Sequence, residues 1–171
     1  ICLYVPNPNY LTEKYIGEGV EGGKERMCTL TKDQQYTFIT LRAMSASPLF
    51  MGGDLPTIDD FSFSLLTNKE MLACNKNGVM GKLVSESETI EIWKTPDKDK
   101  LNEGWISIFN RTNQEVKQVK SIQELGLGNS SLSLLNIWQE DDWKTFSKTD
   151  KLDISIKPNG VLFYKFKIVN L

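Results

Sequence analysis

The hydrophobic pattern of the chain changes its period near Lys82, and this change constrains the fold more than any other feature. Before it, apolar residues recur at helical spacing behind helix-start signals, with one short apolar run between them. After it, apolar and polar residues alternate, which is typical of half-buried strands. We therefore predict an α/β part over residues 1–78 and an antiparallel β part over residues 82–171.

The first helix is predicted from one capping signal and one stop signal. Thr31 and Gln34 have the Thr-x-x-Gln spacing of a capping box. Pro48 ends the helix, because proline disfavours the helical conformation of the residue before it. The helix is therefore predicted from Lys32 to about Ala46. Its apolar residues cover a wide face, as expected for a helix that covers a sheet.

A short strand and two short helices are predicted next. Leu49–Met51 is an apolar run closed by two glycines, which indicates a strand. Thr57 and Thr67 each precede an acidic residue by three positions, so each is predicted to cap a helix. These helices are predicted over residues 59–66 and 68–74. The order helix, strand, helix is typical of an α/β barrel.

Strands dominate from residue 82 onward. About seven are expected, and Pro158–Gly160 reads as a tight hairpin turn between the last two. Together they predict a small antiparallel sandwich. The clearest strand segments are residues 89–93, 104–109, 151–156 and 161–168, and weaker ones cover residues 114–119 and 132–138.

The composition excludes several kinds of site. The sequence has no histidine, so it supplies no Ser-His-Asp or Cys-His arrangement and no His-based zinc site. Cys2, Cys28 and Cys74 lack metal-ligand spacing, and their odd number argues against a disulfide framework. We expect neither a metal nor a cofactor, and any chemistry would have to use carboxylates. A net charge of −2 without a long basic run argues against nucleic-acid binding. No apolar run reaches the roughly 18 residues that span a bilayer.

Two motifs in the α/β part match a known family. Residues 47–55 read Ser-Pro-Leu-Phe-Met-Gly-Gly-Asp-Leu, and residues 66–76 read Leu-Thr-Asn-Lys-Glu-Met-Leu-Ala-Cys-Asn-Lys. They resemble the strand Ala-Pro-Leu-x-x-x-x-Asp-Leu and the segment Leu-x-Asn-x-Glu-Val-x-Ala-x-Asn-Gln. Both belong to the last barrel repeat of the α-galactosidases of glycoside hydrolase family 27 and its clan relatives. The resemblance is strong over residues 29–78 and diffuse beyond them.

The resemblance implies a fold and a domain division. Members of the family leave the barrel for a C-terminal antiparallel β-domain with Pro-His-Gly-Val before its last strand, and residues 158–161 read Pro-Asn-Gly-Val here. The chain would be mainly β with an N-terminal α/β remnant. Residues 1–78 would be the end of a (β/α)8 TIM barrel, from the end of strand seven through helix eight. Residues 82–171 would form a C-terminal antiparallel β-sandwich of Greek-key type.

The resemblance also implies an activity, which is retaining hydrolysis of α-galactosides by the full-length protein. The family's nucleophile and general acid/base lie on earlier barrel strands, which this chain does not contain. Where the family has Asp-Pro-Asp at the end of the seventh strand, this chain has Asn7, Pro8 and Asn9. An amide can hydrogen-bond a sugar hydroxyl but cannot act as a base at neutral pH. We therefore predict no catalytic residue in this chain and no hydrolysis by the chain alone.

Five residues are candidates for sugar contact. Asn7 and Asn9 follow the carboxyl end of one predicted barrel strand and Asp54 follows the next, which is where barrel active sites form. Turn formation by the two asparagines and a structural hydrogen bond of Asp54 are the alternative explanation, and the more common one for such residues. Trp138 and Trp143 flank a charged turn and could stack on sugar faces, and core packing is the alternative for them.

Structural roles explain the remaining candidates. Trp93 and Trp105 alternate within strands, which indicates packing in a core or an interface. Asp59 and Asp60 stand at a predicted helix start, where the helix dipole favours negative charge. The other acidic pairs fall in solvated turns, Asp97 with Asp99 and Asp141 with Asp142.

Two further interpretations stay open. The chain could be a non-catalytic carbohydrate-binding or assembly module, or a degenerate paralogue in which Asn7 and Asn9 mark lost activity. The expected partners are an α-galactoside and either the rest of the catalytic barrel or a second chain, and neither nucleic acid nor a membrane is expected. A bacterial glycosidase of this kind would be periplasmic or secreted.

Overall fold

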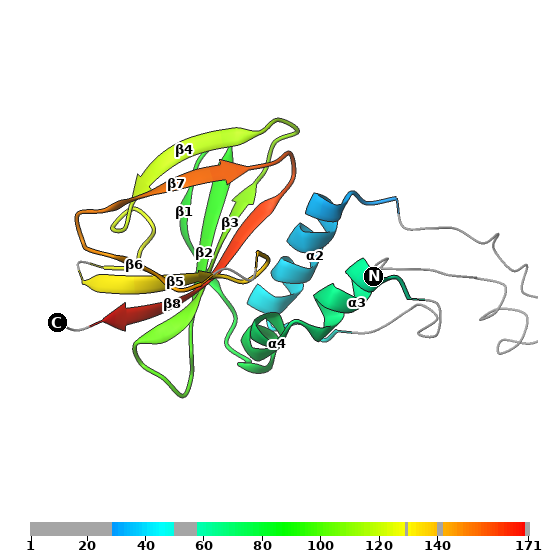
Figure 1. Cartoon of the computed structure of the whole chain (residues 1–171), viewed down its shortest axis with the longest axis horizontal. Coiled ribbons are helices and arrows are strands. Elements are labelled where there is room, and N and C mark those ends of the chain that lie inside the picture. The colour runs from blue at the N-terminus through cyan, green and yellow to red at the C-terminus, as the bar shows by residue number, and fades with distance from the viewer. Residues whose placement is uncertain (1–28, 50–57, 129, 140–141, 170–171) are drawn as a thin grey trace, which may run out of the picture. The chain divides into compact units, whose positions relative to one another are not determined.

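The computed structural model describes residues 29–49, 58–128, 130–139 and 142–169 of the chain. The chain divides into two compact units, residues 1–31 with 49–67, and residues 32–48 with 68–171. The described part of the first unit contains helix α3 (Asp60–Thr67). The second unit contains helices α2 (Lys32–Met44) and α4 (Lys69–Lys76) and two β-sheets (Figure 1). The domain division near residue 80 stays a prediction.

The strands form one sheet of six and one of two. The order in the larger sheet is β1-β2-β3-β8-β5-β6, and the smaller sheet pairs β4 with β7. Every strand pair in both sheets is antiparallel. The described chain is therefore mainly antiparallel β with few helices, as predicted. The strands are β1 (Lys82–Glu86), β2 (Ile90–Pro96), β3 (Glu103–Asn110), β4 (Val116–Ser121), β5 (Ser131–Asn136), β6 (Lys144–Phe146), β7 (Lys151–Ile156) and β8 (Val161–Val169).

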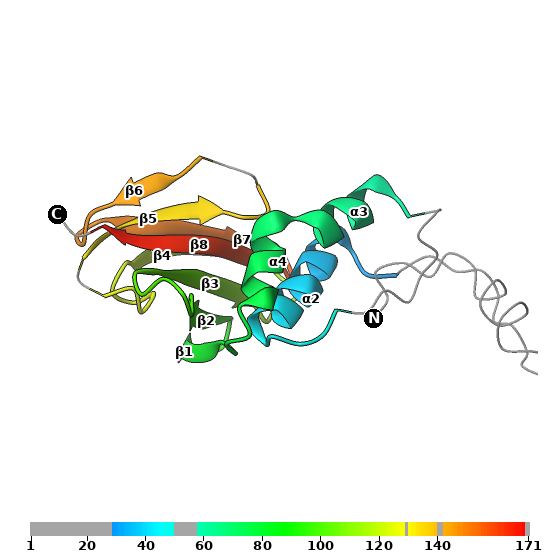
Figure 2. The same cartoon turned by 90° about the horizontal axis from the view of Figure 1, so that it is seen from below.

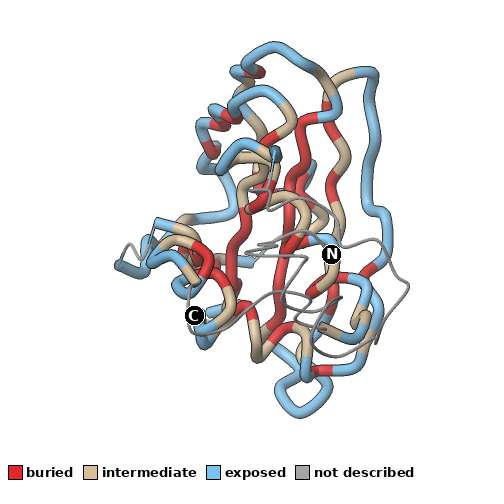
Figure 3. Tube along the Cα trace, turned by 90° about the vertical axis from the view of Figure 1, so that its right-hand side faces the viewer, coloured by how far each residue is buried: buried red, intermediate tan, exposed pale blue. Residues whose placement is uncertain are grey.

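One hydrophobic cluster joins the two sheets. It contains buried side chains from β2, β3, β5 and β8 of the larger sheet and from β4 and β7 of the smaller one. Strand β7 shows the principle, because Leu152, Ile154 and Ile156 are buried while the residues between them are exposed. Figure 3 shows such buried stretches along the strands. Burying a side chain of this size stabilises the fold by about 1.5–3 kcal/mol, so the alternation that the sequence shows also forms the core.

Helix α2 covers the opposite face of the larger sheet. It packs against β2, β3 and β8 and against α4 (Figures 1 and 2). In β3, Ile106 and Ile108 belong to the cluster between the sheets, whereas Trp105 and Ser107 are buried outside it. Since successive strand residues point to opposite faces, Trp105 and Ser107 face the helix side. The sheet thus has a second sheet on one face and helices on the other.

The turn between β7 and β8 corrects one prediction. Gly160 N donates to Lys157 O at 2.9 Å, and Asn159 has a φ of 52°, so the chain turns tightly as predicted. However, β7 pairs with β4 and β8 pairs with β3 and β5, so the two strands do not form a hairpin. Asn110 explains the separation, because its Nδ2 donates to the carbonyl oxygens of Ile156 and Lys157 that a partner strand would otherwise use.

The helix starts correct two capping assignments. Asp59 caps α3, because its Oδ1 accepts from the backbone N–H of Ser62 at 2.9 Å. Asn68 caps α4, and its Oδ1 accepts from Met71 N at 2.9 Å. The predicted cap Thr67 instead ends α3, and its hydroxyl donates to Phe63 O. Carboxylate and amide oxygens at these positions reach the free N–H groups, and such residues rank first as N-caps.

Two predictions about the first part of the chain fall on residues that the structure leaves undescribed. The strand predicted over Leu49–Met51 has only Leu49 described, and Leu49 lies outside any strand. Thr57, the predicted cap of the second helix, is likewise outside the described residues. Among the helices that are described, none is long and apolar enough to cross a bilayer.

Candidate functional site

The five predicted sugar-contact residues divide into two groups. Asn7, Asn9 and Asp54 lie outside the described residues, so their roles stay predictions. Trp138 and Trp143 are described and lie in different surroundings.

Trp138 lies between helix α2 and strand β8. Its ring centroid is 5.0 Å from that of Tyr36 in α2 and 5.9 Å from that of Phe163 in β8, and both ring pairs are tilted. Its Nε1 donates to Thr40 Oγ1 at 2.9 Å, and Thr40 is fully buried. A buried indole N–H needs such a partner, so Trp138 joins the helix to the sheet while its half-buried ring keeps one accessible edge.

The turn after β5 places Trp138 through Asn136. The buried Asn136 accepts from Trp138 N at 3.2 Å with Oδ1 and donates to Gln139 Oε1 at 2.9 Å with Nδ2. The next residue, Ile137, is held by its neighbours, because its N–H donates to Phe163 O and its carbonyl accepts from Asn68 Nδ2. Asparagine favours such turns because its short amide bonds to backbone two residues on. The turn is therefore rigidly tied to both β8 and the start of α4.

Trp143 lies on the surface. The residue is 38% exposed, and Lys167 Nζ lies 4.5 Å from its ring centroid in a cation–π contact. It lines neither of the two pockets described next. Its predicted stacking on a sugar stays a prediction, and the cation already covers one face of the ring.

A pocket of about 250 Å³ opens beside Trp138, between α2 and the turn from β7 to β8. Thr37 Oγ1 donates to Asn159 O at 2.8 Å, which holds the helix to this turn. Lys157 Nζ lies 3.9 Å from Asp33 Oδ2, a loose and solvent-exposed ion pair that neutralises both charges. The residues lining the pocket are Asp33, Tyr36, Asn136, Trp138, Gln139, Ser155, Ile156, Lys157, Gly160, Val161 and Leu162.

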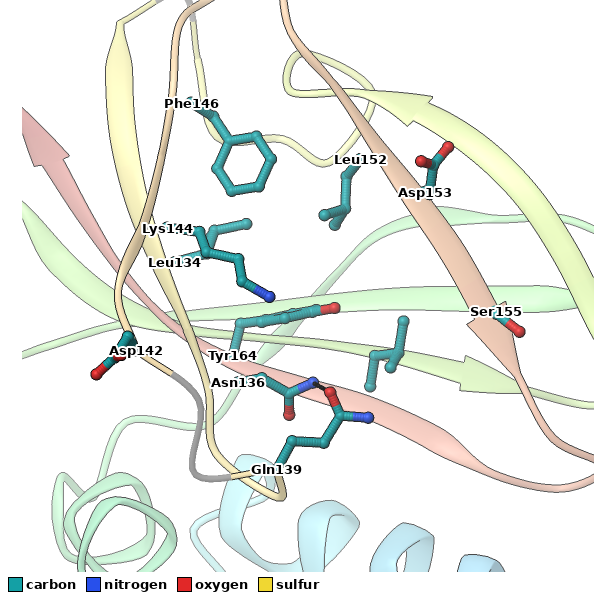
Figure 4. Close-up of a pocket in the computed structure, with 11 residues that line it drawn as sticks. Leu134, Asn136, Gln139, Asp142, Lys144, Phe146, Leu152, Asp153, Ser155 and Tyr164 are labelled. Atoms are coloured by element: carbon teal, nitrogen blue, oxygen red, sulfur yellow. Dashed lines mark hydrogen bonds between the residues drawn. The ribbon is translucent and has the colours of Figure 1, made fainter.

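A second pocket of about 260 Å³ adjoins the first, because Asn136, Gln139, Ser155 and Leu162 line both. Figure 4 shows apolar side chains and the Tyr164 ring around it, with the Lys144 ammonium pointing inward. In the same view the carboxylates of Asp142 and Asp153 point away from the cavity. The other lining residues are Leu134, Phe146 and Leu152. We call the two pockets together the Asn136 groove.

Two of the predicted acidic residues, Asp59 and Asp97, serve local structure. Asp59 accepts from both the side chain and the backbone of Ser62, and these hydrogen bonds lower the pKa of its carboxyl. Asp97 accepts from Asp99 N at 2.9 Å within its own turn. Over the described ranges, no group of three or more potential metal ligands occurs. These contacts give the acids capping and turn-forming roles, as predicted for them.

The groove contains residues that sequence reasoning did not single out. Tyr36, Gln139, Phe146 and Tyr164 come from α2, the turn after β5, β6 and β8, and no spacing in the sequence connects them. Asn136, three residues before Gln139, gives the one local signal, because an asparagine at a strand end favours a turn.

Comparison with known proteins supports the family resemblance. A family model described as alpha galactosidase A matches residues 26–77. Alpha-galactosidase 2 of Arabidopsis thaliana is 26% identical over 138 residues, and the match covers 79% of this chain and 34% of the Arabidopsis protein. Alpha-galactosidase of Cyamopsis tetragonoloba is 26% identical over 113 residues, and the match covers 64% of this chain and 27% of the Cyamopsis protein. The chain therefore spans about a third of the length of the curated relatives it matches.

The structural comparison extends beyond the region that the family model matches. A crystal structure of a family 27 β-L-arabinopyranosidase from Geobacillus stearothermophilus is 27% identical and superimposes with a TM-score of 0.76. The match covers 87% of this chain and 33% of that enzyme. The similarity therefore includes the β-sheets as well as the helices.

Proposed function

This chain belongs to the α-galactosidase-like proteins of glycoside hydrolase family 27, and from that premise we propose that it forms the C-terminal part of a retaining α-galactoside hydrolase. The observation that carries the proposal is the structural match, which takes in most of this chain and about a third of a family 27 enzyme. In this proposal the remaining two thirds of such an enzyme supply the reaction centre. The α-galactoside is the substrate of the whole protein.

The proposal includes a finer description of the fold. Residues 1–78 are the end of a (β/α)8 barrel, and residues 82–171 are a C-terminal β-sandwich of Greek-key type. The order α2, α3, α4 before the first strand supports the first assignment. The hydrophobic cluster shared by two antiparallel sheets supports the second. The barrel strands themselves fall in residues that are not described.

A glycosidase that retains the anomeric configuration uses two carboxyl groups about 5 Å apart, one as the nucleophile and one as the general acid/base. Asp59 and Asp97 are engaged in a helix cap and a turn, which leaves them poorly placed for either task. We assign both catalytic carboxylates to barrel strands outside this chain. Asn7, Asn9 and Asp54, at the carboxyl ends of predicted barrel strands, are then the groups of this chain that would hydrogen-bond sugar hydroxyls.

The β-sheets have a mechanical role in this proposal. Barrel sites demand that each strand end stays within a fraction of an ångström of its productive position. Helix α2 is fixed to the sheet by the bond from Trp138 to Thr40 and to the β7–β8 turn by the bond from Thr37 to Asn159. In this proposal the sheets thus fix α2, the helix that precedes the barrel strand predicted over residues 49–51.

Turnover of an aryl α-galactoside tests the proposal. The assay compares the 171-residue chain with the longest natural polypeptide that contains it, and an aryl β-galactoside serves as the matched control substrate. We expect turnover of the α-galactoside by the longer protein and none by the 171-residue chain. Robust turnover by the chain alone would contradict the assignment of the carboxylates. Failure of the longer protein to cleave any α-galactoside would contradict the assigned substrate.

A further inference from the structure

We propose that the Asn136 groove is a non-catalytic binding site for a neutral oligosaccharide of about two sugar units. The groove lies entirely within the unit formed by residues 32–48 and 68–171. Among the described residues that line the second pocket, the carboxylates of Asp142 and Asp153 point away from the cavity, so we infer binding of a sugar without cleavage. The proposal stands independently of hydrolysis by the longer protein.

The size of the groove fits two ring-sized groups. Its two pockets have volumes of about 260 and about 250 Å³. Each is slightly smaller than the roughly 300 Å³ at which small-molecule sites begin, so each takes one ring and the pair takes two. The shared residues Asn136 and Gln139 lie where the bond between the two rings would pass.

The lining of each pocket combines aromatic rings with hydrogen-bonding groups. Tyr36 and Trp138 contribute rings to the first pocket, and Phe146 and Tyr164 contribute rings to the second. A pyranose has one face of C–H groups, which packs on an aromatic ring, and a rim of hydroxyls, each of which donates and accepts. Amide side chains also donate and accept, so they match hydroxyls at either end of a hydrogen bond.

The charges around the groove favour a neutral ligand. Asp33 and Lys157 neutralise one another at the first pocket. At the second pocket, the Lys144 cation is accompanied by the carboxylates of Asp142 and Asp153 on the rim. The described lining residues include two lysines and three aspartates, so they carry no net positive charge that would attract a phosphate or another anion. A purely apolar ligand would cover the N–H donors of the Gln139 amide without accepting their hydrogen bonds, which costs free energy.

Gln139 lines both pockets and supplies hydrogen-bond donors to the proposed sugar site. Its Oε1 accepts from Asn136 Nδ2 at 2.9 Å, which fixes the amide plane (Figure 4). With the oxygen held, the Gln139 amide turns its two N–H donors outward, and the side chain is exposed to a ligand. Asn136 in turn is buried and bonded to Trp138 N, so the donors are ordered before the ligand arrives. Such preorganisation reduces the entropy lost on binding.

Binding measurements on the 171-residue chain test the proposal. Isothermal titration and NMR chemical-shift mapping would use melibiose, lactose and cellobiose as neutral probes, with a sugar phosphate and a short peptide as probes of other chemistry. We expect saturable binding of at least one neutral disaccharide, with shifts at Gln139, Trp138 and Tyr164. Gln139→Ala should weaken that binding about three- to tenfold, because it removes the ordered donors. Gln123→Ala, an exposed amide outside the groove, should leave it unchanged.

Trp143→Ala separates this groove from the alternative of an exposed sugar-stacking tryptophan. Since Trp143 lines neither pocket, its removal should leave binding unchanged. Three results would overturn the proposal: no saturable binding of the neutral probes by folded chain, binding that Gln139→Ala does not weaken, or preferential binding of the peptide or the sugar phosphate in the groove. None of these results bears on hydrolysis by the longer protein, so the two proposals fail separately.

Discussion

Lys165 and Glu70 join strand β8 to helix α4 through an ion pair, with 2.8 Å between Nζ and Oε2. The Lys165 side chain is only 11% exposed and Glu70 is 34% exposed, so the pair is partly shielded from water. Lys165 Nζ also lies 5.6 Å from the centroid of the Trp105 ring and 3.9 Å from Glu103 Oε2. This contact belongs to the face of the sheet that the helices cover.

The first prediction follows from this pair. Lys165→Ala should lower the free energy of unfolding by about 2–4 kcal/mol, because it removes a largely buried stem and leaves Glu70 without its cation. Lys165→Met should cost less, since methionine fills the volume of the stem. Urea unfolding followed by circular dichroism measures both. Lys167→Ala is the matched control. Its side chain is 43% exposed and loses only solvent-exposed contacts with Trp143 and Glu103, so stability should fall by no more than about 1 kcal/mol. Equal effects at Lys165 and Lys167 would refute the shielding argument.

The second prediction concerns the bond between Trp138 and Thr40. Thr40→Val keeps the approximate shape of the side chain but replaces the oxygen that Trp138 Nε1 now bonds at 2.9 Å by a methyl group, which leaves this N–H without its acceptor. The expected loss in the free energy of unfolding is about 1–3 kcal/mol. Urea unfolding measures it, and Thr145→Val, an exposed threonine bonded to Ser133, is the control with an expected change below about 0.5 kcal/mol. A Thr40→Val chain as stable as the parent would show that the bond does not hold α2.

The third prediction is a pH dependence at the start of α3. Hydrogen bonds from Ser62 lower the pKa of Asp59, so the folded helix binds its proton less tightly than the unfolded chain does. The contribution of the cap is therefore complete above the ordinary pKa of aspartate and is lost as the pH falls through the lower, folded pKa. An NMR titration of the Asp59 carboxyl should give a pKa below the ordinary value of an aspartate. Ser62→Ala removes the hydroxyl but keeps the backbone donor, so it should raise the Asp59 pKa part of the way toward the ordinary value, and an unchanged pKa would exclude the Ser62 hydroxyl as a cause.

The fourth prediction concerns the reactivity of Cys74. Burial raises the pKa of this thiol, and its Sγ lies 3.8 Å from Met44 Sδ in the contact between α2 and α4. Because the thiolate is the reactive form, a thiol reagent should label Cys74 only when the chain opens. In a Cys2→Ser, Cys28→Ser background, labelling with a disulfide reagent should be slow in buffer and fast in urea. Labelling in buffer at the rate of a free peptide would contradict the burial.

The sequence patterns predict the strands better than their partners. Period-two alternation identifies β7, which buries every second residue. Strands β3 and β8 are found from their β-branched and aromatic segments, and their central residues are buried on both faces because the sheet is covered on both sides. The same patterns do not reveal β1, which is exposed along its whole length, or β6, which has three residues. Strand β1 has no buried residue to produce an alternation, and β6 is too short to show one, although its Phe146 packs against the core.

The candidate site was less predictable than the fold, for a related reason. The bond that positions Trp138 joins residues 98 positions apart, and nothing local in the sequence indicates Thr40 as its partner. The groove likewise gathers Tyr36, Gln139, Phe146 and Tyr164 from separate elements, and only the order of strands in the sheet brings them together. Local propensity determines where helices and strands begin, whereas a site depends on long-range packing.

The anomeric configuration of the first product tests the central claim most directly. The longest natural polypeptide that contains these 171 residues would be given an aryl α-galactoside, and proton NMR would follow the released sugar before it mutarotates. A retaining mechanism with both carboxylates supplied from outside this chain predicts that α-galactose appears first. Initial release of β-galactose would contradict a retaining mechanism, and release of any galactose by the 171-residue chain alone would contradict the placement of the carboxylates.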